Sequence, residues 1–315
     1  MKKTINSEII EGRLYQHNLE LKTVQNKDSA NFGTEFISGT IDVATDEEGL
    51  NVISTHFTYV VEMTKNGKKN VTFGVLKNII DGAKCWVTDG KDAALKVRIS
   101  TALALNDFYV AEGDGERLVS AKRNEGGFVN IVKDLAPEAE RNTFKCDMVI
   151  TGVTLVEANP ENNIPEDYLK IRGAVFNFRN DLLPVEFVCR DTSGMKYFEG
   201  LDVSAKNPVF TEVRGKIVSN TVEQKIEEES AFGTVSVKTV SRNVKEWAID
   251  WARPTEYDFG ADDVLTEAEL TKAMQNREVY LAEVKKRYDD YQATKKSGGN
   301  SNNNTASVPT GGFDF

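Results

Sequence analysis

The sequence predicts a mainly β body of two domains, followed by one helix and a disordered tail. Nearly all hydrophobic periodicity before residue 255 has a period of two, and β-branched and aromatic residues are abundant there. The 315 residues are 40% hydrophobic and 28% charged, which is typical of globular proteins and sufficient for two ordinary domains. From Ser297 onward the composition changes to Ser, Gly and Asn, which predicts disorder because such a segment cannot offset its ordering entropy by burial.

The first domain is expected over residues 1–135. Apolar spacing and a closing glycine predict a short helix over residues 71–82, between the third strand region and the later ones. Strands, a helix and then more strands follow each other in this way in an OB barrel, a five-stranded Greek-key barrel. The strands are expected at 8–23, 35–44, 51–64, 93–101, 104–111 and 118–132, the last folded about Gly126-Gly127.

A second OB-like domain is expected over residues 143–255, after a polar stretch that contains Pro137. A faint internal echo between residues 36–41 and 149–154 favours duplication, and so tandem OB-like Greek-key barrels. A single large sandwich is the alternative. The second set of strands is expected at 143–158, 168–179, 184–190, 196–203, 209–220, 232–240 and 244–251.

A helix is expected over residues 264–296. Thr266 and Glu269 form a capping box, in which the hydroxyl and the carboxylate satisfy the first free backbone amides. The apolar stripe of this helix must be covered, either by its own domain or by a second subunit in a homo-oligomer. The stripe consists of Leu270, Met274, Leu281, Val284, Tyr288 and Tyr291. Residues 297–315 then form a disordered linker with an acidic and aromatic tip.

Cysteine and histidine usage predicts neither disulfides nor a metal site. Cys85, Cys146 and Cys189 are odd in number, far apart and embedded in apolar strand-like runs, so reduced core thiols are expected. His17 and His56 lack partners at metal-ligand spacing. No cofactor is predicted.

Neither a membrane segment nor a secretory signal is predicted. No apolar run approaches the roughly 20 residues that span a bilayer, and no apolar stretch follows Lys2 and Lys3 at the start. A cytoplasmic protein is therefore expected.

No catalytic motif is recognisable. The sequence matches no P-loop, nucleophile elbow or zinc-protease helix. The stretch 111–116 resembles a glycine-rich loop, but it is acidic and reads better as a hairpin turn. These absences favour a binding protein over an enzyme; a nuclease would require a metal-binding cluster of carboxylates drawn from distant strands.

Two strands combine aromatic rings with positive charge. Alternation places Lys170, Arg172, Phe176 and Phe178 on one face of their strand, with Ile171 and Val175 on the other. Near the start of the chain, one face likewise carries Arg13, Tyr15 and His17. Such faces suit single-stranded nucleic acid, because bases stack on rings while cations follow the phosphates. The alternative is a reversed register, with these rings in the core.

Further cations are expected in loops at strand ends, where they would flank the groove of an OB barrel or serve only as soluble surface. They are Lys65, Lys68, Lys69, Lys122 and Arg123, and Lys196 adds a cation beside Tyr197 and Phe198. Trp247, Ile249 and Trp251 are expected in the core. The net charge of −10 does not exclude a phosphate-containing partner, because binding depends on whether cations cluster on one face and not on the charge of the whole chain.

The chain resembles phage-type single-stranded DNA-binding proteins, which place an OB-fold body ahead of a disordered linker and an acidic tail ending in Phe. The resemblance rests on this layout and on Phe313-Asp314-Phe315. It implies that the tip recruits replication and recombination enzymes, with Phe315 and its carboxylate entering a basic, apolar pocket. Family tails usually carry a run of acids, whereas this tip has one Asp, which implies weak or host-specific recruitment.

The leading hypothesis is therefore a protein without enzymatic activity that coats single-stranded DNA in phage DNA replication and recombination, within the bacterial host cytoplasm. Its partners would be single-stranded DNA and the enzymes recruited by its tip. The alternative is a virion structural or assembly protein with a β-rich body, which would be indifferent to DNA.

Overall fold

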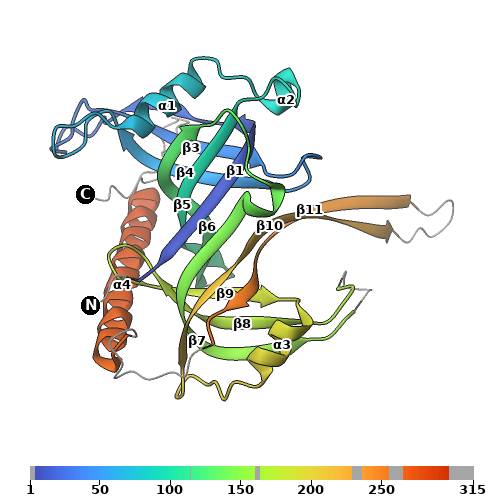
Figure 1. Cartoon of the computed structure of the whole chain (residues 1–315). Coiled ribbons are helices and arrows are strands. Elements are labelled where there is room, and N and C mark those ends of the chain that lie inside the picture. Colours follow the sequence, from blue (N-terminus) through green and yellow to red (C-terminus); the bar gives the residue numbers. More distant parts are fainter. Residues whose placement is uncertain (1–3, 114, 160–163, 229–235, 255–264, 298–315) are drawn as a thin grey trace.

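The structure is a computed structural model that describes residues 4–113, 115–159, 164–228, 236–254 and 265–297; for residues 220–228, 236–244 and 296–297 it describes the backbone alone. The fold is mainly β with a C-terminal helix, as the sequence predicts (Figure 1). The predicted tail and its tip lie outside the described residues. None of the described helices combines the length and apolar character needed to cross a membrane.

The first barrel consists of β1 (Asn6–His17), β3 (Glu35–Ala44), β4 (Val52–Val61), β5 (Lys96–Glu112) and β6 (Gly115–Ile131), with β2 (Glu20–Thr23) added beside β3. β3 pairs with β1 and β4, β6 closes the ring by pairing in parallel with β4, and β5 joins β6 to β1. Helices α1 (Val71–Ile80) and α2 (Trp86–Asp89) lie between the third and fourth barrel strands. This is the connectivity of an OB barrel.

The second barrel repeats this connectivity. It consists of β7 (Asn142–Val156), β8 (Tyr168–Phe176), β9 (Leu182–Cys189), β10 (Val209–Glu228) and β11 (Ser236–Ala252), with helix α3 (Thr192–Glu199) again before the fourth strand. β9 and β11 form the parallel pair that closes it. A 3-10 turn, η1 (Glu138–Glu140), precedes it. Tandem OB-like barrels are thus confirmed, while the division into domains 1–135 and 143–255 as separate folding units stays a prediction.

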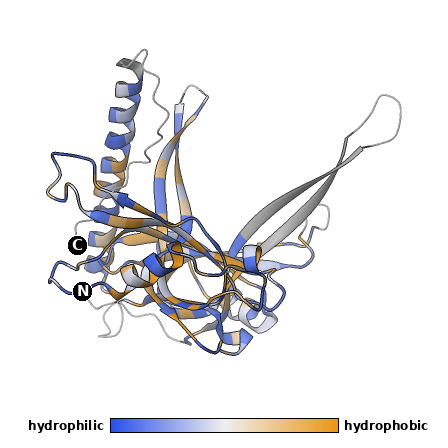
Figure 2. Ribbon diagram, turned by 90° about the horizontal axis from the view of Figure 1, so that it is seen from above, coloured by the Kyte–Doolittle hydropathy of each residue, from blue (hydrophilic) through white to orange (hydrophobic). Residues whose placement is uncertain are grey.

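The barrel interiors share one apolar core. Figure 2 shows orange apolar residues concentrated on the barrel strands and blue polar residues in the surrounding loops. Ile10, Leu14 and Ile99 line the first barrel, and Ile171 and Val175 line the second. Cys85, Cys146 and Cys189 are buried free thiols, which agrees with their predicted place in the core.

Several predicted elements were wrong. Residues 196–203 were expected to form a strand, but Asp191 caps helix α3 by accepting a hydrogen bond from the Gly194 amide. Residues 118–132 do not fold back at Gly126-Gly127; β6 continues past a bulge there. A Cβ on Gly127 would lie 1.7 Å from the Ser100 carbonyl oxygen. The similar stretches 36–41 and 149–154 lie in β3 and β7, which do not occupy equivalent positions in the two barrels.

Helix α4 (Glu267–Ser297) lies along one side of the molecule, beside both barrels (Figure 1). The predicted capping box is present, because the Glu269 amide donates to the Thr266 hydroxyl and the Thr266 amide to the Glu269 carboxylate. Arg277 forms a bidentate ion pair with Asp107 of β5, with distances of 2.6 and 2.7 Å. The helix therefore packs on its own chain, although Met274 and Tyr291 of the predicted stripe are exposed.

The barrels are joined where β1 pairs with β7, from Asn6↔Cys146 to Ile10↔Asn142 (Figure 1). At the centre of this pairing the Trp247 indole of the second barrel donates a hydrogen bond of 2.8 Å to Glu8 of the first. Glu8 is 1% exposed, and its other carboxylate oxygen has no partner among the described residues. Burial raises the pKa of Glu8 from 4.5 to about 8, so the group is protonated at neutral pH.

Glu8→Gln should remove one pH dependence of stability. A carboxyl whose folded pKa is raised stabilises the fold fully below its unfolded pKa, and that stability is lost as the pH rises through the folded pKa. The stability changes between pH 4.5 and about 8. Across this range the free energy of unfolding of the wild type should fall by on the order of 4 kcal/mol more than that of Glu8→Gln. Urea titrations at several pH values measure this difference, with exposed Glu35→Gln as control. If the free energy of unfolding changed with pH equally in the wild type and in Glu8→Gln, the raised pKa of Glu8 would be contradicted.

Candidate nucleic-acid interface

The outer face of β8 and β9 carries a row of cations and one aromatic ring. Tyr168, Lys170 and Arg172 alternate with the buried Leu169 and Ile171 on β8, as the period of two predicts. Register places Lys170 opposite Val188 and Arg172 opposite Glu186 of β9. We call the surface formed by Tyr168, Lys170, Arg172, Glu186 and Arg190 the β8–β9 face.

An ion pair holds Lys170 and a hydrogen bond holds Arg172 on the β8–β9 face without burying them. The Lys170 amine lies 3.5 Å from the Glu186 carboxylate, and these side chains are 38% and 41% exposed. Arg172 is exposed, and its guanidinium donates to the Thr154 hydroxyl at 3.0 Å. It lies over Gly152, where no side chain intervenes. Exposed ion pairs of this kind contribute little stability, so their cations can exchange partners.

Arg190 and Tyr168 form a stacked pair at one end of the face. The guanidinium carbon is 4.4 Å from the ring centroid. The same guanidinium donates to both oxygens of Glu246 of β11, at 3.0 and 3.1 Å. This pair supplies a planar cation on an aromatic ring, the kind of surface on which nucleobases stack. Neither residue was identified from the sequence, although Tyr168 continues the alternation of Lys170 and Arg172.

The first barrel reaches this face through Lys122. Its amine donates to the Glu186 carbonyl oxygen at 2.6 Å and lies 4.8 Å from the centroid of the Trp247 ring. Burial lowers the pKa of Lys122, while Glu186 and Glu246 oppose that shift. The structure thus brings Lys122 and Lys170 together at Glu186, but Lys122 lies within β6 and not in the loop that the sequence predicts.

Of the two rings predicted to face solvent on β8, Phe176 is buried and Phe178 is exposed. Phe176 is 0% exposed, because α4 covers the outer face of β8 at this point and packs Ala273 near it. It cannot receive a base in this arrangement. Phe178 follows the strand end and is exposed, with the Arg179 guanidinium carbon 5.2 Å from its ring centroid.

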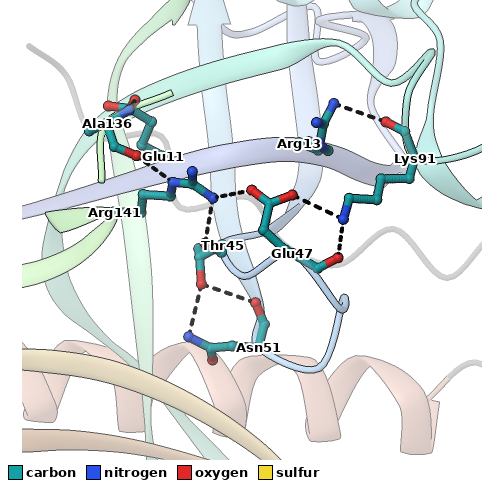
Figure 3. A network of polar contacts seen from close by, with 8 residues as sticks. All are labelled: Glu11, Arg13, Thr45, Glu47, Asn51, Lys91, Ala136 and Arg141. Carbon is teal, nitrogen blue, oxygen red and sulfur yellow. Dashed lines mark hydrogen bonds and ion pairs between the residues drawn. The ribbon is translucent and has the colours of Figure 1, made fainter. Parts of the chain in front are cut away.

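Of the residues predicted on β1, Arg13 belongs to a structural network (Figure 3). Arg13 donates to the Lys91 carbonyl oxygen at 3.0 Å. Glu47 binds both Lys91 and Arg141, and hydrogen bonds from these two cations lower its pKa to about 2. The network ties the β3–β4 loop to the segments before β5 and β7.

Tyr15 and His17 also serve the fold around β1. Tyr15 is the extra residue of a bulge, and its ring centroid lies 6.0 Å from that of Trp86 in α2. His17 is half-buried, which lowers its pKa.

The remaining predicted cations lie apart. Lys65, Lys68 and Lys69 are exposed in the turn between β4 and α1, and Lys196 is exposed on helix α3. Arg123 pairs with Glu125 on β6. No hydrogen bond or ion pair among the described side chains links any of these five to Lys170 or Arg172. Phe198, close in sequence to Lys196, is 1% exposed.

The predicted core face of β11 is interrupted by a bulge. Trp247 and Ile249 are buried as expected. The register then shifts at Asp250, so Trp251 pairs with Arg214 and is 40% exposed. The Arg214 guanidinium carbon lies 4.3 Å from the Trp251 ring centroid.

The described residues contain no group of three or more His, Cys, Asp or Glu side chains that could hold a metal ion.

The solved structures to which the chain is similar include the wild-type single-stranded DNA binding protein from Thermus aquaticus. The two share 10% sequence identity with a TM-score of 0.46, over 82% of this chain and 98% of that one. A deletion mutant of that protein gives the same identity and TM-score over 84% of this chain and 100% of the other. No curated protein matches the chain. A family model described as YorF matches residues 5–287, so the chain belongs to the YorF family.

Proposed function

We propose that this protein binds single-stranded DNA on the β8–β9 face and acts by binding, without catalysis. The observation that carries the proposal is the solvent-facing row of the half-buried Tyr168 and Lys170 and the exposed Arg172 along one strand of an OB barrel, with Arg190 stacked on Tyr168. Cations that follow a backbone and flat groups that accept bases are the two requirements for binding single strands without base-edge contacts.

The carboxylates of the face set how phosphates would bind. Glu186 is 41% exposed and holds Lys170 at 3.5 Å, so a phosphate can displace it at small cost. Glu246 is 18% exposed and grips Arg190 with two oxygens. We therefore assign phosphate contacts to Lys170 and Arg172, and assign Arg190 and Tyr168 to base stacking. Affinity should fall steeply with salt, because each phosphate contact releases counterions.

Lys170→Glu with Arg172→Glu should weaken binding to oligo-dT by roughly tenfold or more at moderate salt, because two phosphate contacts become repulsive. Fluorescence anisotropy with labelled oligo-dT measures the change, and the dependence on salt concentration should become shallower. The matched control is Lys84→Glu with Lys272→Glu, which makes the same charge change at two exposed sites elsewhere.

Equal losses in both double variants would mean that only net charge matters, and the β8–β9 face would not be the site. If the wild type did not bind oligo-dT even at low ionic strength, DNA binding itself would be wrong, and binding without any salt dependence would contradict the assigned phosphate contacts. A virion assembly protein would then be the better account.

We further propose that the tail acts in recruitment during DNA replication and recombination in bacteria or their phages. Phe313, Asp314 and Phe315 would enter a basic, apolar pocket on a partner enzyme. This part of the proposal rests on the resemblance of the layout to phage-type single-stranded DNA-binding proteins, since the tip lies outside the described residues.

A chain that ends at Lys296 should bind oligo-dT as tightly as the full chain or more tightly, because removing an acidic tip removes competition with phosphate. It should fail to retain host replication proteins that the full chain retains on a column. Anisotropy and pull-down measure the two effects separately. A loss of DNA binding on truncation would contradict the recruiting role and place the tail in the DNA site.

A further inference from the structure

Helix α4 covers the continuation of the β8–β9 face. The outer row of β8 runs from Tyr168 through Lys170 and Arg172 to Ala174 and Phe176, and its pairing with β9 continues without a bulge to the end of the strand. Arg172 is exposed, whereas Ala174 and Phe176 are buried. The change from open to covered residues therefore occurs within one strand, where α4 packs on it.

The residues under α4 form one apolar patch on the outside of the second barrel. Phe176 pairs with Leu182 of β9. Ala174 pairs with Val149 of β7, which in turn pairs with Phe210 of β10. These five side chains are at most 9% exposed and form a cluster separate from the one that fills the barrels. We call Val149, Ala174, Phe176, Leu182 and Phe210 the covered patch.

The covered patch has the composition of a base-stacking surface. It contains the Phe176 and Phe210 rings among aliphatic side chains, and on β8 it begins two residues after Arg172. A rise of about 3.3 Å per residue places Phe176 roughly 13 Å along the strand from Arg172. Bases stack on aromatic rings with little sequence preference, while neighbouring cations hold the phosphates. With the patch open, a strand bound at Lys170 and Arg172 would continue onto rings.

The attachment of α4 differs along its length. A bidentate ion pair between Arg277 and Asp107, whose side chains are 10% and 1% exposed, ties the middle of the helix to the first barrel. The first turns lie on the covered patch through Leu270 and Ala273, and Leu270 is only partly buried. Helix ends open at lower free energy than helix interiors. The first turns can therefore leave the patch while Arg277 keeps the helix on β5.

We propose that the covered patch is a second site for unpaired bases and that the first turns of α4 mask it. This inference rests on the proposed function, because the strand that reaches the patch is the one bound on the β8–β9 face. Docking of α4 and binding of bases exclude each other, so the affinity for DNA at the patch is reduced by the fraction of molecules in which it is open. By reciprocity, a bound strand shifts α4 towards the open state.

Leu270→Gln with Ala273→Gln tests the masking, because two amides then face the apolar patch and weaken the docking of α4 without changing the charge. The affinity for oligo-dT, measured by fluorescence anisotropy, should rise by about fivefold or more, the equivalent of one added base stack. The matched control is Val279→Gln with Ala282→Gln, two similar changes at the same spacing on the exposed side of the helix. It should bind oligo-dT as the wild type does.

Phe176→Leu distinguishes a base site from a general loosening of the fold. In the wild type this change should alter the affinity for oligo-dT little, because the ring is masked. Added to Leu270→Gln with Ala273→Gln, it should remove most of the gain, because the stacking ring is lost while the apolar character is kept. A gain that persists without the ring would contradict the base site.

Hydrogen–deuterium exchange of the wild type, with and without saturating oligo-dT, decides the matter even if a variant fails to fold. Residues 267–275 should exchange faster when oligo-dT is bound. Unchanged or slower exchange there would overturn the masking, as would a double variant whose α4 exchanges faster but whose affinity equals that of the wild type. A wild type that does not bind oligo-dT would refute the proposed function as well, whereas binding that depends on Lys170 and Arg172 but leaves α4 unaffected would refute the masking alone.

Discussion

The backbone pairing of β1 with β7 is the constraint on which the rest of the structure depends. It converts two small barrels into one body, so that an apolar core, a six-stranded sheet and the helix α4 extend across both. At its centre, a buried carboxyl, Glu8, accepts a hydrogen bond from Trp247. A buried polar group without a partner would be destabilising, so this contact makes the joint specific to one register. Further contacts fix the same geometry: Asn51 bridges the Ile217 carbonyl and the Ser219 amide.

The pairing of β1 with β7 also explains how the proposed DNA site is assembled. Lys122 belongs to the first barrel, yet its amine donates to Glu186 of the second and lies over Trp247. A positive charge is thereby held at the edge of the β8–β9 face, next to Lys170. The same pairing makes β6-β5-β1-β7-β10-β11 one continuous sheet, whose outer side carries the exposed rings of Phe128 and Trp251 near its two ends. One pairing therefore defines two surfaces with different chemistry, one with exchangeable ion pairs and one with buried ion pairs.

The sequence predicted the class of fold well, because period-two alternation and the position of a helix between the third and fourth strands are local signals. It predicted the wrong outcome where distant contacts or bulges decide. Phe176 lies on the expected side of β8, but α4, about a hundred residues later in the chain, covers it. Trp251 lies outside the core because the bulge at Asp250 shifts its register. Lys122 lies within a strand because β6 continues past Gly126-Gly127. Arg190 was missed because only the fold places it on Tyr168.

Hydrogen–deuterium exchange with and without oligo-dT tests the central claim most directly, since it reports the site on the unmodified chain. The account predicts slower exchange in β8 and in the segment from β9 to Arg190 when oligo-dT is bound, with β5 and the turn that carries Lys65 unchanged. Protection confined to β5, β6 or the turn that carries Lys65, with none in β8, would contradict it.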